Sequence, residues 1–357
     1  MSNIFARSPY VIEIDEASQL ATKLELFIWN GTGSAPSSPQ YTFSKSIPAS
    51  NNTATNYNIS PYIREYFNHI TPLNPTSKQL LSSATALTTL NWCNVMVKRY
   101  KDIGAGYVLV DSTTYFAFDG FGYYTEGYNY DNGNYLRTQK AYTYASGVYA
   151  GYVVAYLGVN WRLEWDDGTT THFDSAVTTA GWYAIPLNYL GGTTGSWTLG
   201  IFRQYEDSPI VTYSTIEKNE CKYTPITCDF VNKYGMWQRE FFFKASNDTL
   251  NISTSKYNVM PTDNTDWGDY PNYSIVEGQS RTFNVNGKES IKVNTDWVDE
   301  DWKNNLKELM LSERILINSK PASLNTKSTE LFKHINTKMI NYTLEFEFDY
   351  NIINNVM

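Results

Sequence analysis

The chain contains few of the residues from which metal centres and redox sites are built. Its 357 residues include three histidines and three cysteines, Cys93, Cys221 and Cys228. The spacing between Cys221 and Cys228 matches no zinc knuckle, and no histidine lies near a cysteine in the sequence. An odd number of cysteines without a secretion signal indicates reduced thiols. We therefore expect no metal site and no cofactor.

Clusters of positive charge and long apolar runs are also missing. The net charge is −8, the pI is about 5.0, and lysine and arginine are scattered. Nucleic-acid binding needs concentrated positive charge to displace counterions, so we expect no nucleic-acid partner. No run approaches the ~20 apolar residues that cross a bilayer, so we expect no membrane insertion. Residues 1–7 lack the apolar run of a signal peptide, which predicts synthesis and solubility in a cytoplasm.

Catalytic motifs are the third absence. The sequence has no Walker-type phosphate-binding loop, no G-x-S-x-G and no H-E-x-x-H. One pair of carboxylates deserves weighing for glycoside hydrolysis: Glu164 with Asp166 or Asp167, beside Trp161 and Trp165. Asp166 begins a turn, however, and a solvated strand end explains these residues more simply. We expect that the chain is not an enzyme.

Aromatic residues are abundant. They make up 16% of the chain, with 29 tyrosines and 10 tryptophans, and this composition suits β-strands, subunit contacts and stacking on sugars alike. Residues 104–152 are dense in glycine and tyrosine but poor in leucine and isoleucine, which a core would need. Three interpretations remain open for this stretch: a solvent-exposed hairpin, a platform for sugars, or a subunit contact.

The pattern along the chain predicts a mainly-β fold of tandem β-sandwich-like modules with a few short helices. The length exceeds that of one ordinary core. The first module, residues 1–135, holds alternating strands, a short helix with Ser60 as N-cap and Pro61 at its first position, and the Gly/Tyr-rich insertion. The central module, residues 136–260, includes a hairpin that turns at Asp166-Asp167-Gly168.

The C-terminal module, residues 261–357, reads as α+β. A hairpin is expected to turn at Asn286-Gly287, the strongest two-residue turn signal. A helix over residues 296–314 follows, with acidic residues in its first turn and basic residues toward its end. Its apolar stripe consists of Val298, Trp302, Leu306, Leu309 and Met310. A final strand over residues 339–350 alternates apolar and polar residues, which predicts one buried face.

Four short patterns stand out along the chain: Ile59–Arg64, Phe118–Tyr123, Val231–Trp237, and Trp297–Ser312 followed by Asn341–Phe346. They resemble the tail and baseplate structural proteins of tailed phages that infect Bacteroidetes and marine bacteria, the crAss-like phages among them. The resemblance implies a virion structural component in the tail or baseplate, made in the host bacterial cytoplasm. Its implied partners are other virion tail proteins and copies of itself, assembled as a repeated subunit.

Aromatic side chains of the insertion and of the last strand are the expected interface. These candidates are Phe121, Tyr123, Tyr124, Tyr128, Tyr130, Tyr342, Phe346 and Phe348. An exposed Phe346 and Phe348 would form a patch that invites association. Two rivals stay open: a receptor-binding tail protein whose tyrosines and tryptophans stack on a host surface glycan, and, more weakly, a glycan-cleaving enzyme.

Overall fold

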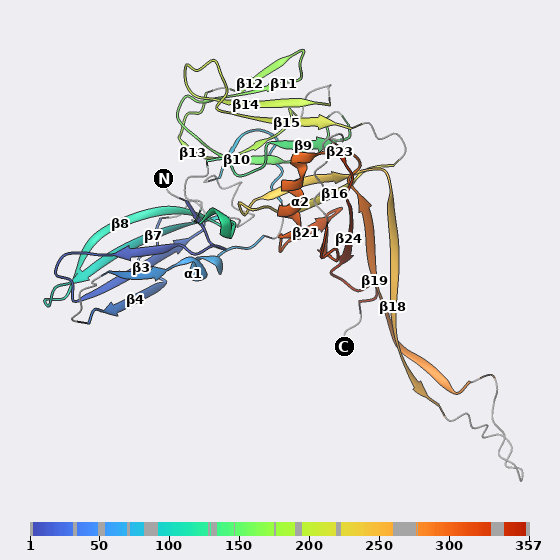
Figure 1. Cartoon of the computed structure of the whole chain (residues 1–357), viewed down its shortest axis with the longest axis horizontal. Coiled ribbons are helices and arrows are strands. Elements are labelled where there is room, and N and C mark those ends of the chain that lie inside the picture. Colours follow the sequence, from blue (N-terminus) through green and yellow to red (C-terminus); the bar gives the residue numbers. More distant parts are fainter. Residues whose placement is uncertain are drawn as a thin grey trace, which may run out of the picture.

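The fold is mainly β, as the sequence predicts. A computed structural model describes residues 3–30, 34–48, 54–69, 72–81, 92–127, 129, 134–145, 147–174, 176–189, 195–218, 223–259, 276, 278–329 and 339–354. Of these described residues 51% lie in strands and 7% in helices. The strands form three modules around a shared centre, and one pair of strands extends far from the body (Figure 1). No helix in the described part of the chain is long and apolar enough to cross a bilayer.

The N-terminal module is a five-stranded sheet covered on one face. Its strands, in sheet order, are β1 (Asn3–Phe5), β8 (Tyr107–Phe118), β7 (Trp92–Asp102), β3 (Ala21–Trp29) and β4 (Tyr41–Ser46). The cover consists of β2 (Val11–Ile14), β5 (Thr55–Asn58) and α1 (Ser60–Arg64). Alternate residues of β3 are buried, and Leu24 and Leu26 pack with Ile63 of α1 in one core. The predicted short helix exists, but Ile59 is its N-cap, because the Ser60 hydroxyl donates instead to the Ser8 carbonyl at 2.6 Å.

The central module is a sandwich of two sheets. One sheet has the order β10 (Tyr152–Leu157), β13 (Gly181–Pro186), β6 (Gln79–Leu80). The other has the order β12 (Thr171–Asp174), β11 (Arg162–Asp166), β14 (Trp197–Phe202), β15 (Val211–Glu217), β9 (Lys140–Thr143). Apolar residues of both sheets, such as Val153 and Leu199, share one core. The predicted hairpin is confirmed: β11 pairs with β12, and Gly168 supplies the positive φ of the turn.

The C-terminal module is a seven-stranded sheet with a helix on it. Its sheet order is β17 (Trp237–Phe242), β16 (Ile226–Val231), β21 (Ile315–Ile317), β22 (Lys320–Leu324), β24 (Thr343–Phe348), β19 (Ser280–Asn294), β18 (Ser246–Asn258). A short pair, β20 (Val298–Asp299) with β23 (Met339–Ile340), lies beside it. Because β16, β17 and β18 belong to this sheet, the C-terminal module includes residues 226–258. The sequence pattern had predicted these residues to be part of the central module. Likewise β6 joins the central module from within the predicted first one.

The helix of this module is shorter than predicted. Asp296 has a left-handed φ of 56°, and β20 then pairs with β23, so helical structure starts only at η3 (Glu300–Trp302) and continues as α2 (Lys303–Met310). The apolar stripe of the prediction is buried at Val298, Trp302, Leu306 and Leu309, and Met310 is half-buried. The predicted burial of the stripe is therefore confirmed, and the predicted helix bounds 296–314 are wrong.

The predicted turn at Asn286-Gly287 is wrong. β19 runs straight through both residues, and Gly287 lies opposite Ile252 in the middle of the β18–β19 ladder. The only irregularity nearby is a β-bulge, where Asn284 has a φ of 50°. Continuous pairing along a long neighbouring strand overrides a turn preference that depends on two residues alone. The connection from β18 to β19 lies outside the described residues.

Candidate functional site

The most distinctive feature is the pair formed by β18 and β19, which we call the ribbon (Figure 1). β19 pairs with β24 only through residues 290–294, so beyond this root it is bonded mainly to β18. The described C-terminal end adds one brace, since the Ile352 amide donates to the Gly287 carbonyl at 2.9 Å. At about 3.3 Å per residue, the 13 residues of β18 span roughly 40 Å.

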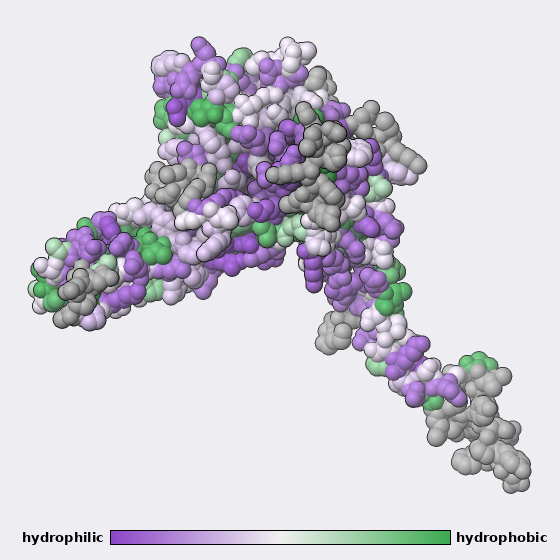
Figure 2. Space-filling view, in the orientation of Figure 1, coloured by the Kyte–Doolittle hydropathy of each residue, from purple (hydrophilic) through white to green (hydrophobic). Residues whose placement is uncertain are grey.

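The ribbon exposes apolar side chains along its length. Every residue of β18 is exposed. Leu250 and Ile252, which share one face because side chains alternate, are 54% and 63% exposed. Further along, the rings of Tyr257 and Phe283 touch with centroids 5.6 Å apart and remain about half exposed. Figure 2 shows these apolar spots between hydrophilic stretches of the ribbon.

A ribbon of this kind needs something to pack against. A two-stranded hairpin is marginally stable in water by itself, because neither face is covered. The free edge of β18 also presents unpaired backbone groups, which are a template for pairing with another chain. The alternation of Leu250 and Ile252 with polar residues is a local signal for this strand, but nothing local indicates that both faces are exposed.

A second feature is the junction where the modules meet. Two of the runs that carry the phage resemblance contact each other there, although about a hundred residues separate them. The Phe121 amide donates to the Lys233 carbonyl at 2.8 Å. A Cβ on Gly235 would lie 2.6 Å from the Asp119 backbone, and one on Gly120 would lie 2.9 Å from the Lys233 carbonyl oxygen. Only glycine permits this approach of the two backbones.

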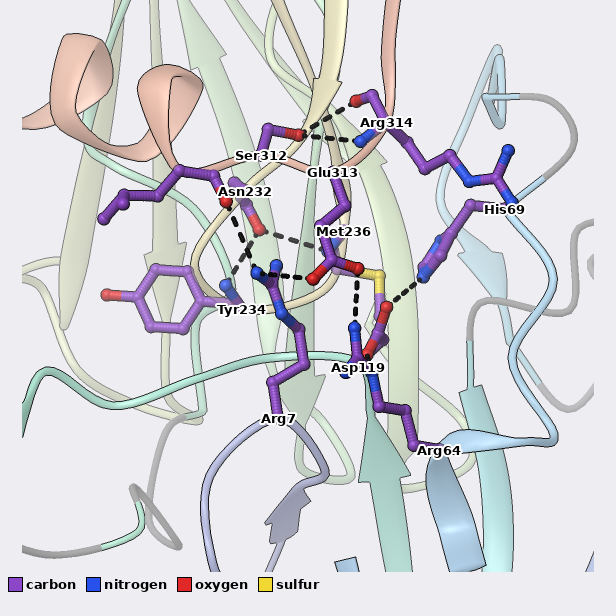
Figure 3. Close-up of polar contacts among 11 residues, drawn as sticks. Arg7, Arg64, His69, Asp119, Asn232, Tyr234, Met236, Ser312, Glu313 and Arg314 are labelled. Carbon is purple, nitrogen blue, oxygen red and sulfur yellow. Dashed lines mark hydrogen bonds and ion pairs between the residues drawn. The ribbon is translucent and has the colours of Figure 1, made fainter. Parts of the chain in front are cut away.

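Ion pairs of Arg7, Arg64 and Glu313 also lie at the junction (Figure 3). Glu313 accepts from Arg64 at 2.6 Å and lies 3.2 Å from the Arg7 guanidinium, so it links the N-terminal module to the loop after α2. Asp119 lies 3.0 Å from Nε2 of the buried His69 and 3.7 Å from Arg64. Arg64 ends the run 59–64, so three of the resembling runs converge at the junction.

Polar groups are buried where the central and C-terminal modules meet. Arg137 and Glu240 are both enclosed and lie 3.6 Å apart. Burial raises the pKa of Glu240 and lowers that of Arg137, because desolvation outweighs their mutual attraction. Glu240 also accepts from Asn305 at 2.8 Å and from the Trp302 indole at 3.3 Å. Sequence reasoning missed this cluster, since a charged residue on a strand is ordinarily solvated.

The interface candidates of the insertion have mixed environments. Phe121 is half-buried beneath the Arg7 guanidinium, 4.8 Å from its ring. Tyr123 lies under the ammonium groups of Lys307 and Lys233, and burial raises its pKa to about 12. Tyr124 is fully exposed. Two further candidates, Tyr128 and Tyr130, lie outside the described residues.

The structure corrects the expectation that the three candidates of the last strand are exposed. Tyr342, Phe346 and Phe348 are buried in the chain's own core, with relative exposures of 3%, 0% and 8%. The alternation of the strand was read correctly, but α2 and the facing side chains of the sheet cover its apolar face. These rings therefore leave nothing for a neighbouring subunit to contact.

Within the described part of the chain, the carboxylates and cysteines considered in the sequence are held in local hydrogen bonds or buried in the core. Glu164 accepts from Arg162 at 2.6 Å, and Asp166 caps its own turn by accepting from the Gly168 amide at 2.7 Å. Cys93 and Cys228 are buried free thiols whose pKa values burial raises, and Cys221 lies outside the described residues. The described residues contain no group of three metal-ligating side chains.

Comparison of the chain with protein-family models, curated proteins and solved structures gives no match.

Proposed function

We propose that this chain is a structural component of a tailed-phage virion, located in the tail or baseplate and assembled as a repeated subunit. The observation that carries the assembly role is the ribbon: a long pair of strands that, beyond its root, leaves apolar side chains such as Leu250 and Ile252 more than half exposed. The phage assignment itself is supported by the short runs described above, three of which meet at one junction.

The ribbon is suited to bind a neighbouring subunit in the manner of strand addition. An added strand gains backbone hydrogen bonds from the free edge of β18, and pockets for Leu250 and Ile252 would supply specificity. When the neighbour is another copy, each subunit gives its ribbon to the next one, and such head-to-tail contacts form a ring when the rotation between subunits closes.

The direct test shortens the ribbon. A variant that removes residues 253–286 and joins Ile252 to Gly287 through an Asn-Gly turn retains the root of the ribbon. We expect this variant to fold with nearly unchanged thermal stability, because the described residues of the removed part are exposed or half-exposed. In a phage that carries it, we expect particles without complete tails, seen by electron microscopy.

A point variant with a matched control refines the test. Ile252→Lys places a charge on the ribbon, whereas Leu20→Lys places one at a site of similar exposure, 57% against 63%, in the N-terminal module. Only the first should reduce tail assembly. Normal, infective particles from both the shortened ribbon and Ile252→Lys would contradict the proposal.

A second candidate function is attachment to a host glycan by the same tail protein. One observation favours it: a cavity between the N-terminal and C-terminal modules, lined by polar side chains together with Trp237.

A further inference from the structure

The sandwich of the central module has an open edge. In the described part of the chain β12 pairs with β11 alone, so its outer side presents backbone N–H and C=O groups that no other described strand covers. Thr171 is exposed, and Phe173 is 69% exposed. β12 contains no proline and no lysine, the residues with which sheet edges ordinarily prevent pairing. This edge is therefore able to accept a further strand.

A cavity of about 210 Å³ lies between the two sheets beside this edge. Trp165 of β11 and Phe173 of β12 line it from one sheet, and Pro186 of β13 lines it from the other. Tyr189, a further lining residue, stacks on His172 of β12 with ring centroids 4.0 Å apart, so the cavity adjoins the edge strand. An apolar cavity of ~150 Å³ holds a benzene molecule. The larger cavity at the β12 edge has room for one branched apolar side chain.

The pairing within the sheet decides which side chains of an added strand would face the cavity. His172 lies opposite Trp165 in the β11–β12 ladder, so both share the face that looks onto the other sheet, where Trp165 is buried. In an added strand the residue opposite His172 faces the same way, and its two neighbours face outward. The β12 edge therefore fits a strand in which one apolar residue stands between two polar ones.

The ribbon supplies a strand of this pattern. In β18 the side chain of Ile252 is 63% exposed and stands between Asn251 and Ser253. Like β12, β18 lies at an edge of its sheet. Figure 1 places β12 and the outer part of the ribbon at opposite ends of the molecule, so a ribbon does not reach the β12 edge of its own chain. The fitting partner is a second copy.

Charge sets the direction of the added strand. The turn that precedes β12 carries two carboxylates, Asp166 and Asp167, and no basic residue. Antiparallel pairing with Ile252 at the cavity brings Lys256, four residues later in β18, to this turn, where opposite charges attract. Parallel pairing would bring Asp248 to the turn instead and place three carboxylates together. Charge complementarity therefore favours the antiparallel arrangement.

We propose that the edge of β12 and the cavity beside it accept the ribbon of a second copy, with β18 added antiparallel and Ile252 in the cavity. This inference rests on the proposed assembly role and names the surface that receives the ribbon. Because the ribbon and its acceptor are different surfaces, each chain both gives a ribbon and receives one, which makes the contact head-to-tail.

The test uses two variants of the full chain in analytical ultracentrifugation. Phe173→Lys places a charge at the acceptor, and Ile252→Lys places one on the ribbon. Each variant alone should stay monomeric at concentrations where the unaltered chain forms oligomers. An equimolar mixture should form a dimer and nothing larger, because only one intact ribbon meets one intact acceptor. Tyr205→Lys is the control, since Tyr205 is 89% exposed between β14 and β15, and this variant should assemble as the unaltered chain does.

A second measurement covers the case in which Phe173→Lys does not fold. Asn251 lies opposite Phe173 in the proposed register, so a photoreactive benzoylphenylalanine in place of Asn251 should cross-link to residues 171–174 of another chain, as mapped by mass spectrometry. Lys256→Glu should weaken the association about tenfold, because it brings a third carboxylate to the turn.

Three results would overturn the inference. The first is assembly of a folded Phe173→Lys chain like that of the unaltered chain while Ile252→Lys fails, which would leave the ribbon its role and place the acceptor elsewhere. The second is cross-links from residue 251 that fall on another strand. The third is an unaltered chain that stays monomeric at ~1 mM, which would mean that the neighbour is not another copy. The assembly role itself is decided separately, by the shortened ribbon in the phage.

Discussion

Single residues at the module junction are constrained by backbone geometry more than by their side chains. Gly235 combines a φ of 79° with a position where a Cβ would meet the Asp119 backbone at 2.6 Å. We expect Gly235→Ala to lose the ~1–2 kcal/mol typical of a left-handed residue and a further amount for the displaced backbone. Gly127→Ala is the control, because Gly127 has a similar φ of 75° and open space around it. Chemical denaturation should separate the two variants; equal losses would show that the close contact is unimportant.

Glu308 makes the free energy of unfolding depend on pH. It is buried at the end of α2 with its Oε2 accepting from the Lys233 amide at 3.3 Å, and burial raises its pKa from 4.5 to about 7. Between these values the folded chain holds a proton that the unfolded chain releases, so this residue makes the free energy of unfolding decrease as pH rises from 4.5 to 7. Glu308→Gln keeps the acceptor and should raise the melting temperature more at pH 8 than at pH 5. The same gain from the exposed Glu345→Gln would refute this assignment.

At the scale of elements, α2 depends on its contact with the sheet. Trp302 is 3% exposed, lies against Tyr342 with ring centroids 6.0 Å apart, and donates to the buried Glu240. Trp302→Ala should lower the free energy of unfolding by roughly 3–5 kcal/mol. Trp297→Ala, at a position that is 51% exposed, should change it little. Unchanged melting of the Trp302 variant would contradict the packing described for this helix.

The elements also show which parts of the fold a sequence can predict. The hairpin of β11 and β12 was predictable because its turn, Asp166 to Gly168, and its alternation are local signals that agree. The course of β19 through Asn286-Gly287 was not, because it depends on β18 pairing from about 35 residues away. The cavity beside His69 and Trp237 could not be predicted either, since no local pattern links the two residues and only the packing of two modules brings them together.

At the scale of the molecule, the three modules share a central apolar core and are not independent domains. Phe5 and Phe118 of the N-terminal module pack with Trp182 of the central module and with Met236 and Trp237 of the C-terminal module. The ion pairs of Glu313 lie nearer the surface, where such pairs contribute little. The apolar core therefore holds the modules together.

This core predicts cooperative unfolding. Phe118→Ala removes a fully buried ring that lies 5.2 Å from Trp182, and it should lower the melting temperature of the whole body in one calorimetric transition. Glu313→Gln should lower the free energy of unfolding by less than about 1 kcal/mol, because it removes only the ion pairs of an exposed carboxylate. Separate transitions for the N-terminal module and the rest would show that the modules are independent.

The two strands of the ribbon, β18 and β19, continue into the seven-stranded sheet, and this continuity has a mechanical consequence. A pull along the ribbon acts along β18 and β19, while the hydrogen bonds that join β19 to β24 run across that direction. The hydrogen bonds between β19 and β24 are therefore loaded together in shear and do not break one at a time. A neighbouring molecule that pulled on the ribbon would therefore transmit that tension directly into the seven-stranded sheet.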